Sequence, residues 1–200
     1  EVAGPGHLNF YLSHISLSRV VTEIESLGAA YGASTIGQGK YVSNEFISAN
    51  PTGPLHLGNG RGGFFGDTLS RVLEKVGYQV TNEYYVNDAG GQIEKLGHSV
   101  LGDSEAVYAG EYIEQLHSKL KENSSNGNAQ VIGEMAATIV LEEMIKPTLS
   151  DKMGIRFDRF VSEKHDIIES GYVERAIAIL QEKQLTYKDE DTEALWLRTT

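Results

Sequence analysis

Residues 40–86 read KYVSNEFISANPTGPLHLGNGRGGFFGDTLSRVLEKVGYQVTNEYYV, and the order of patterns within them decides the fold. Side chains alternate between two faces over residues 40–48, which predicts a strand. After a loop with two prolines at residues 50–54, apolar residues recur at helical spacing from Phe64 to Val76. Tyr78–Val86, rich in β-branched and aromatic residues, predicts a second strand. This order predicts a βαβ unit with a right-handed crossover, and hence an α/β fold of the nucleotide-binding type.

The segments on either side of this unit are expected to have other roles. Upstream lie an expected strand, an amphipathic stretch and a linker of small residues: His7–Leu12, Leu17–Leu27 and Gly28–Gly39. Downstream, apolar residues at three- and four-residue spacing predict three helices, with a polar turn at Asn123–Asn128 between the first two. The predicted helices are Glu105–Glu122, Ala129–Gly154 and Gly171–Lys183.

The segment Pro54–Gly63 is predicted to bind phosphate, because it lies where the loop enters the helix. A helix N-terminus presents free N–H groups and the positive end of the helix dipole, and glycines let a phosphate approach the backbone. Gly58, Gly60 and Gly63 match the dinucleotide pattern G-x-G-x-x-G. That fingerprint requires the glycines directly after a strand and an acid at the end of the next strand. Here a loop with two prolines comes first and Glu83 lies inside the strand, so a dinucleotide site is disfavoured, and no Walker A sequence is present.

The four residues His56-Leu57-Gly58-Asn59 resemble the HIGH signature of class I aminoacyl-tRNA synthetases. The longer segment Glu45–His56 looks like the first strand and signature of arginyl-tRNA synthetases. Further segments resemble that family in the same order, so the resemblance covers nearly the whole chain. They are Val2–Phe10, Asn87–Gly90, Gly110–Ile113, Ile155–Asp158, Glu169–Gly171 and Ala194–Thr199.

The resemblance implies an α/β fold that forms the first half of a Rossmann-like nucleotide-binding catalytic domain with a mainly helical insertion. Residues 1–39 would be the end of an appended N-terminal domain and a linker. Residues 40–104 would be the first half of the catalytic domain, and residues 105–200 a connective insertion truncated at its C-terminus. The chain is therefore expected to be a fragment that is inactive alone.

The resemblance also implies the reaction, in which ATP activates L-arginine as an adenylate and the arginyl group passes to its tRNA. His56 and Asn59 would be the catalytic residues, and His56, Gly58, Asn59 and Gly60 would bind ATP. Mg²⁺ is expected to come with ATP, and no protein ligands for a metal are identified. Asn59 stands where the family signature has its second histidine; it keeps a hydrogen-bond donor but cannot carry a positive charge. Activation of arginine could therefore be weakened or retuned.

For arginine, the resemblance points to Glu45 at the guanidinium and to Ser48 and Asn50 at the substrate's backbone groups. Elementary chemistry agrees, because a guanidinium is best held by a carboxylate. An acid near the end of a first parallel strand also faces the ligand crevice of such folds. Two alternatives stay open: Asn87 and Asp88 could form a turn or one of them could contact a ligand, and Arg61 could form an ion pair or contact a phosphate.

Composition limits the other classes of protein. The chain has 200 residues and a formal net charge of −11, which argues against a general nucleic-acid coat. It has no cysteine, which excludes disulfides, CxxC redox chemistry and thiolate zinc sites, and a reducing cytoplasm fits. No apolar window approaches the roughly 18 residues of a membrane span. The expected protein is a cytoplasmic monomer without membrane partners. The alternative is a noncatalytic, synthetase-like module that binds a nucleotide or tRNA.

Overall fold

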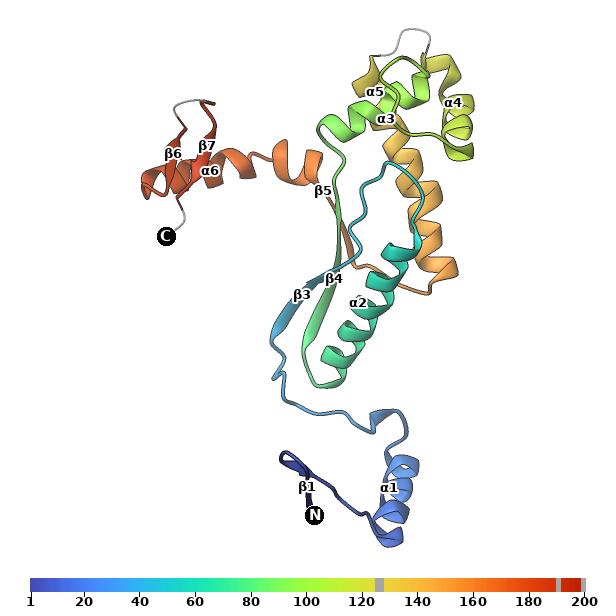
Figure 1. Ribbon diagram of the computed structural model, residues 1–200, viewed down its shortest axis with the longest axis vertical. Coiled ribbons are helices and arrows are strands. Elements are labelled where there is room, and N and C mark those ends of the chain that lie inside the picture. The colour runs from blue at the N-terminus through green and yellow to red at the C-terminus, as the bar shows by residue number, and fades with distance from the viewer. Residues whose placement is uncertain (125–127, 190–191, 199–200) are drawn as a thin grey trace. The chain divides into compact units, whose positions relative to one another are not determined.

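The computed structural model describes residues 1–124, 128–189 and 192–198 (Figure 1). Contacts divide the chain into two units, residues 1–42 with 71–79, and residues 43–70 with 80–200. Part of the predicted polar turn, residues 125–127, lies outside the described residues. None of the helices in the described ranges is long and apolar enough to cross a membrane.

Helices account for most of the regular structure. The α-helices are α1 (His14–Leu27), α2 (Leu57–Lys75), α3 (Gly91–Leu101), α4 (Glu111–Ser124), α5 (Ala129–Ile139) and α6 (Tyr172–Glu182). A 3-10 turn covers Gly28–Ala30, and π-helical turns cover Val140–Ile145, Thr148–Lys152 and Glu163–Ile168. The strands are β1 (Val2–Ala3), β2 (His7–Leu8), β3 (Tyr41–Glu45), β4 (Gln79–Val86), β5 (Arg159–Ser162), β6 (Thr186–Lys188) and β7 (Leu195–Leu197).

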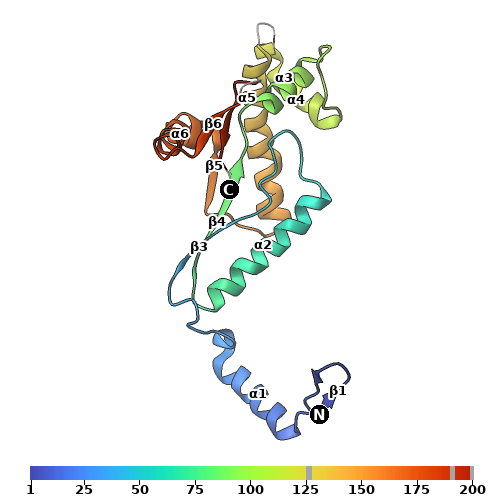
Figure 2. The same ribbon diagram turned by 60° about the vertical axis from the view of Figure 1, so that its left-hand side comes forward.

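Strands β3, β4 and β5 form a three-stranded sheet in that order (Figure 2). β4 and β5 are parallel, with Glu83 opposite Arg159. The Gln79 N–H donates to the Lys40 carbonyl at 2.9 Å. Further along, the Phe46 N–H donates to the Glu83 carbonyl, so β3 and β4 also run in the same direction. The predicted βαβ unit is confirmed as β3–α2–β4, and the sheet gains β5, a strand of four residues that was not predicted.

Small residues let α2 pack closely against the end of β3. A Cβ built on Gly66 would lie 2.3 Å from Phe46 Cγ, and one on Gly63 would lie 2.8 Å from Ile47 Cδ1. By contrast, the apolar residues whose spacing predicted this helix include Phe65, which is 73% exposed. Gly63, one of the three glycines in the dinucleotide-like pattern, is therefore explained by the packing of the helix.

Four aromatic rings form the core between the sheet and the segment that leads into β5. Phe46 lies 4.5 Å from Phe157, and Tyr84 lies 5.1 Å from Phe160, measured between ring centroids. Tyr84 is fully buried. Because stacked and edge-on ring pairs stabilise beyond the area they bury, this cluster fixes the sheet under the candidate site.

Helices α3, α4 and α5 gather at one end of the second unit (Figure 2). α3 and α5 cross through two glycines: a Cβ on Gly97 would lie 1.7 Å from the Ala129 carbonyl oxygen, and one on Gly133 would lie 1.9 Å from the Ile93 carbonyl oxygen. α3 was not predicted. The predicted helix Glu105–Glu122 begins only at Glu111 as α4, because residues 103–110 form turns and a loop.

The long predicted helix Ala129–Gly154 is confirmed in position, but it continues beyond α5 as π-helical turns. The three-part division at residues 39 and 104 stays a prediction.

The first unit contains α1, which begins at the Ser13 cap, where Ser13 Oγ accepts from the Ser16 N–H at 3.2 Å. The predicted amphipathic stretch is thus helical, and the small-residue linker forms turns. The expected strand His7–Leu12 is limited to His7–Leu8, which pairs with β1. At the other end of the chain, the predicted helix Gly171–Lys183 is confirmed as α6, and β6 and β7 form an antiparallel pair.

Candidate functional site

The chain leaves β3 through two residues with left-handed backbone. Ile47 has φ of 66° and Ser48 has φ of 39°, a region that L-residues other than glycine seldom adopt, β-branched ones least of all. The Ser48 N–H donates to the Phe46 carbonyl at 2.9 Å, which closes a three-residue turn. The predicted strand therefore stops short of Ser48. Such backbone strain persists where the surrounding structure holds it, and it concentrates at functional sites.

Two tyrosines of β4 hold the segment that follows. The Tyr84 hydroxyl donates to the Ala49 carbonyl at 2.9 Å, and the Tyr85 N–H donates to Ser48 Oγ at 3.0 Å. Burial raises the pKa of Tyr84 well above its ordinary value, so this hydroxyl stays a donor at every physiological pH. Ser48 Oγ accepts one bond and keeps its own proton free to donate.

The side chains of His56 and Asn59 both cap the first turn of α2. Asn59 Oδ1 accepts from the His56 N–H at 3.0 Å, and His56 Nδ1 accepts from the Gly58 N–H at 3.1 Å. The arrangement is similar to a capping box, except that the His56 side chain bonds to the N–H of Gly58 and not to that of Asn59. Because Nδ1 accepts, the proton of the neutral imidazole lies on Nε2. His56 Nε2–H and the Asn59 amide N–H groups are the donors that the cap leaves free.

The glycines of this turn have different neighbours. A Cβ on Gly58 would lie 3.0 Å from His56 Cε1, so glycine there makes room for the imidazole ring. A Cβ on Gly60 would meet only Met153, at 4.0 Å. No acidic residue lies in the first turn of α2, so the helix dipole there is not cancelled by a neighbouring carboxylate.

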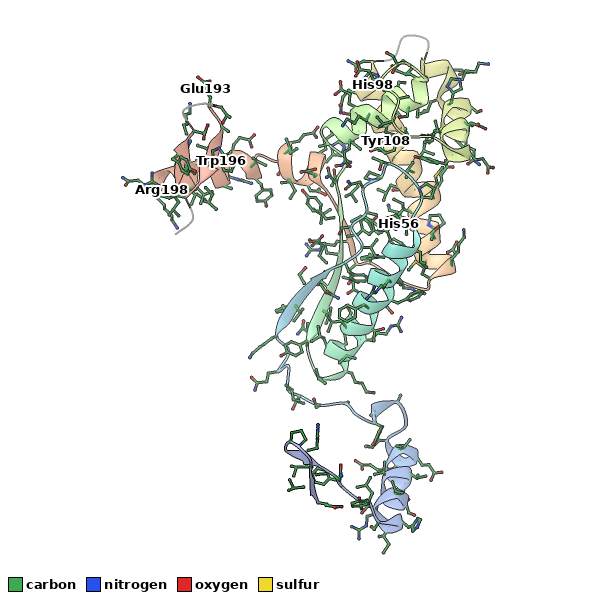
Figure 3. All side chains as sticks on the ribbon, viewed as in Figure 1. His56, His98, Tyr108, Glu193, Trp196 and Arg198 are labelled. Atoms are coloured by element: carbon green, nitrogen blue, oxygen red, sulfur yellow. The ribbon has the colours of Figure 1, made fainter. Side chains whose placement is uncertain are left out.

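A cavity of about 390 Å³ opens beside this turn. It brings together three predicted site residues: Asn50, His56 and Asn59. Two tyrosines from the second half of the chain, Tyr108 and Tyr112, complete it; Figure 3 labels His56 and Tyr108. The remaining lining residues are Ala49, Thr52, Gly53 and Pro54.

Glu45 and Ser48 do not line this cavity. Glu45 ends β3 and is exposed, and its charge reaches Tyr85 on the neighbouring strand. Burial, and then the charge and hydrogen bonding of Glu163, raise the pKa of Tyr85, with smaller contributions from Asp88 and Glu45. The carboxylates of Glu45 and Glu163 are thus both close enough to Tyr85 to act on its phenol, at the carboxyl edge of the sheet.

Sequence reasoning missed Glu163 because it missed β5. Glu163 directly follows Ser162, the last residue of that strand, as Glu45 ends β3. The short run Arg159–Ser162 was the only signal that could have placed it. Gln92, at the start of α3, was missed for a similar reason; its side-chain oxygen accepts from the Asn50 amide.

The structure gives partners for Asp88 but leaves the alternatives for Arg61 open. Asp88 accepts from Ser162 Oγ at 2.6 Å and from the Lys164 N–H at 2.9 Å, so its carboxylate joins the ends of β4 and β5. This gives Asp88 a structural role, and a ligand role for Asn87 or Asp88 stays a prediction. Arg61 is exposed one turn into α2, and its role stays open. Within the described ranges, no group of three or more His, Asp or Glu residues could hold a metal ion.

Comparison with known proteins identifies relatives of the chain. A family model described as tRNA synthetases class I (R), catalytic domain, matches residues 21–122. The arginine–tRNA ligase of Citrifermentans bemidjiense is 40% identical over 220 residues, which cover 100% of this chain and 39% of the relative. That of Shouchella clausii is 36% identical, covering 100% of this chain and 38% of its own.

Solved structures agree with these matches. A crystal structure of a Campylobacter jejuni protein assigned as an arginyl-tRNA synthetase superposes with a TM-score of 0.75 at 33% identity, covering 93% of this chain and 43% of that one. Thermus thermophilus arginyl-tRNA synthetase gives a TM-score of 0.57 at 25% identity, covering 98% and 35%. The chain thus spans about two fifths of the length of the curated relatives it matches.

Proposed function

This chain belongs to the class I arginyl-tRNA synthetase family, and from that premise we propose that the whole protein ligates L-arginine to its tRNA at the expense of ATP. The first step would form arginyl-adenylate and pyrophosphate. The second would pass the arginyl group to the terminal adenosine of the tRNA. The fold is the α/β fold of the family's catalytic domain, and its parallel sheet supports this assignment.

The observation that carries the proposal is the pair of side-chain caps that His56 and Asn59 form at the start of α2. It leaves His56 Nε2–H and the Asn59 amide as free donors, next to the positive end of a helix with no acid in its first turn. Negative charge builds on phosphate oxygens as the carboxylate of arginine attacks the α-phosphorus. Donors that are held in place before the reaction stabilise this charge without reorganisation. The pair His56 and Asn59 would therefore bind ATP and stabilise the transition state, and Gly58 and Gly60 would let the phosphates approach.

Asn59 would replace the hydrogen bonding, but not the charge, of a histidine at this position. Its cap bond uses the oxygen, so both amide protons remain available. It supplies hydrogen bonds but no positive charge, and Mg²⁺ bound to the phosphates of ATP would supply the remaining charge compensation. Mg²⁺ is proposed to arrive with the nucleotide, whose phosphates would hold it.

Arginine would bind at the carboxyl edge of the sheet. Glu45 is the proposed partner of the guanidinium, and Glu163 lies close enough to the same Tyr85 to share that role. Two carboxylates suit a planar group with five N–H donors. Ser48 Oγ keeps a free proton, and Asn50 lines the cavity beside His56, so both remain candidates for the substrate's backbone groups. The whole protein is proposed to act as a monomer in the cytoplasm, where charged tRNA is consumed.

The test is ATP–pyrophosphate exchange by the whole protein, with arginine and tRNA supplied. We expect arginine-dependent exchange in the wild type. Glu45→Gln should raise the KM for arginine about 30-fold or more and leave the KM for ATP nearly unchanged, because it removes the charged partner of a guanidinium. The matched control is Glu83→Gln, which removes an acid from the neighbouring strand, where it pairs with Arg159 at 3.3 Å.

Two results would count against these assignments. Absence of exchange with both arginine and tRNA present would favour the noncatalytic, synthetase-like module. Unchanged arginine kinetics in Glu45→Gln would remove Glu45 from the arginine site while leaving the reaction in place.

A further inference from the structure

Tyr108 and Tyr112 line the cavity beside the first turn of α2, and the proposed reaction so far gives them no role. The cavity, of about 390 Å³, joins them to Asn50, His56 and Asn59, more than 45 residues earlier in the chain. That volume lies within the usual range for small-molecule sites, which runs from about 300 to 1,000 Å³. Tyr108 lies in the loop before α4 and Tyr112 lies in the first turn of α4, so folding brings the two rings to this cavity.

The phenol end of Tyr112 is directed at the loop that precedes the signature. A Cβ built on Gly53 would lie 3.3 Å from both Cζ and Oη of Tyr112. Gly53 thus leaves the space that the tyrosine fills. Both tyrosine rings are half-buried and pack on the hydrophobic core, which holds them in place.

Neither phenol has a hydrogen-bond partner in the described part of the chain, although each can donate one bond and accept another. Burial, and then the neighbouring Tyr108, raise the pKa of Tyr112, so its hydroxyl is neutral at physiological pH. An aromatic wall with two neutral hydroxyls fits a flat, polar-edged ring better than it fits a charged group.

The hydrogen-bond donors and the aromatic rings of the cavity come from different segments. His56 and Asn59, at the start of α2, supply the free N–H donors, and the two tyrosines supply the rings. A ligand with a phosphate and a flat base would therefore place its phosphate toward the helix and its base toward the tyrosines.

We propose that Tyr108 and Tyr112 form the binding wall for an adenosine group whose phosphate is held at His56 and Asn59. The adenosine belongs either to ATP or to the 3′ end of the tRNA, since both substrates of the proposed reaction carry it. The inference deepens the proposed function and rests on it for the identity of these two substrates. Stacking of a base on an aromatic side chain contributes about 1–3 kcal/mol, and about 1.4 kcal/mol corresponds to a tenfold change in affinity.

The test compares Tyr112→Leu with Tyr112→Phe in the whole protein. Leu removes the aromatic face and Phe keeps it, so Leu should raise the KM of one adenosine-bearing substrate about tenfold while Phe changes it less than about threefold. The matched control is Tyr41→Leu, at a tyrosine that is 82% exposed on β3. If Tyr112→Leu fails to fold, Tyr108→Leu takes its place, with Tyr112→Phe as the folded reference.

Two arms distinguish the source of the adenosine. A rise in the KM for ATP in pyrophosphate exchange assigns the wall to ATP. A rise in the KM for tRNA in aminoacylation assigns the wall to the tRNA, when the variant and the wild type bind tRNA that lacks its terminal adenosine with equal affinity.

Direct titration of ATP and of tRNA against each variant keeps this test separate from the proposed function. A wild type that shows no exchange contradicts the proposed function, while the titrations still show whether the two tyrosines contribute to ligand affinity. Unchanged affinity and unchanged KM for both ligands in Tyr112→Leu and Tyr108→Leu would overturn the inference.

Discussion

The signature segment Ser48–Asn59 and the crossing of α3 with α5 are held in opposite ways. The signature segment is held by bonds between side chains and backbone, such as the Tyr84 hydroxyl on Ala49 and the Asn59 oxygen on His56. At the crossing, backbone meets backbone, because Gly97 and Gly133 leave no side chain between the helices.

This contrast separates function from stability. Polar caps on a half-exposed loop orient donors and leave them open to a ligand, so changes there should alter binding and rate more than folding. In a close-packed interior, every added atom causes strain. Changes at the crossing should therefore alter stability first, and activity only through it.

The largest effect is expected at His56. His56→Ala removes the Nε2–H donor and should lower kcat of pyrophosphate exchange by about 10²–10³-fold, as does the loss of one preorganised donor in other enzymes. The loss of its cap bond should cost only about 0.5–2 kcal/mol of helix stability. The control is His165→Ala, since His165 lies in another cavity and pairs with Glu169. A kcat within threefold of wild type would contradict the role of His56.

The next effect is expected at the crossing. Gly133→Ala places a Cβ 1.9 Å from the Ile93 carbonyl oxygen, so the two helices must separate. Overpacking of this kind costs about 1–3 kcal/mol, and we expect the upper end because backbone cannot move aside as a side chain can. The measurement is amide hydrogen exchange in α3 and α5, which reports local stability within a larger protein.

Gly62→Ala is the matched control for that change. Gly62 is also helical, but a Cβ there meets nothing within 4 Å. Alanine should be neutral or stabilising at this position by up to about 1 kcal/mol, because glycine is a poor helix former. Equal effects of Gly62→Ala and Gly133→Ala would show that the crossing is not close-packed.

The sequence predicted the elements that carry a repeating pattern. β3, α2 and β4 follow from alternation and helical spacing, and the start of α2 follows from its glycines and His56. β5 has only four residues, too few for a pattern to stand out. α3 does carry apolar residues at Ile93, Leu96 and Val100, but its length of 11 residues and internal Gly97 weakened the signal.

The sequence also did not predict the packing that small residues allow. The apolar spacing of α2 marked a helix but not its buried face, because Gly63, Gly66 and Ser70 are the buried residues and Phe65 is exposed. The candidate site shows the same limit. His56 and Asn59 lie in one short segment that a motif can mark, whereas Tyr112 reaches the cavity only through tertiary contacts.

A smaller effect is expected in the polar network between α2 and strands β3 and β4. Buried Ser70 Oγ donates to Asn82 Oδ1 at 2.6 Å and accepts from Asn44 Nδ2 at 2.7 Å. Ser70→Ala removes a partner from both amides and should lower local stability by about 1–2 kcal/mol, because buried polar groups left unpaired are costly. Hydrogen exchange of α2 and β4 measures it. Thr68→Ala, at an exposed hydroxyl bonded within the helix, is the control and should change little.

The smallest effect is a pH dependence of stability at the end of α3, the first of the two crossing helices. His98 Nδ1 lies 2.7 Å from Asp103 Oδ2, and this hydrogen bond raises the pKa of His98 and lowers the pKa of Asp103. The stabilisation from protonated His98 is present below its unfolded pKa of about 6.5 and is lost as pH rises through the raised value. The stabilisation from ionised Asp103 is present above its unfolded pKa of about 3.9 and is lost as pH falls through the lowered value. Protection of α3 amides, corrected for intrinsic exchange, should therefore be greatest between about pH 4 and 6.5 and decline toward pH 8. Asp103→Asn should flatten that decline, and an unchanged profile in this variant would show that the pair does not stabilise the helix end.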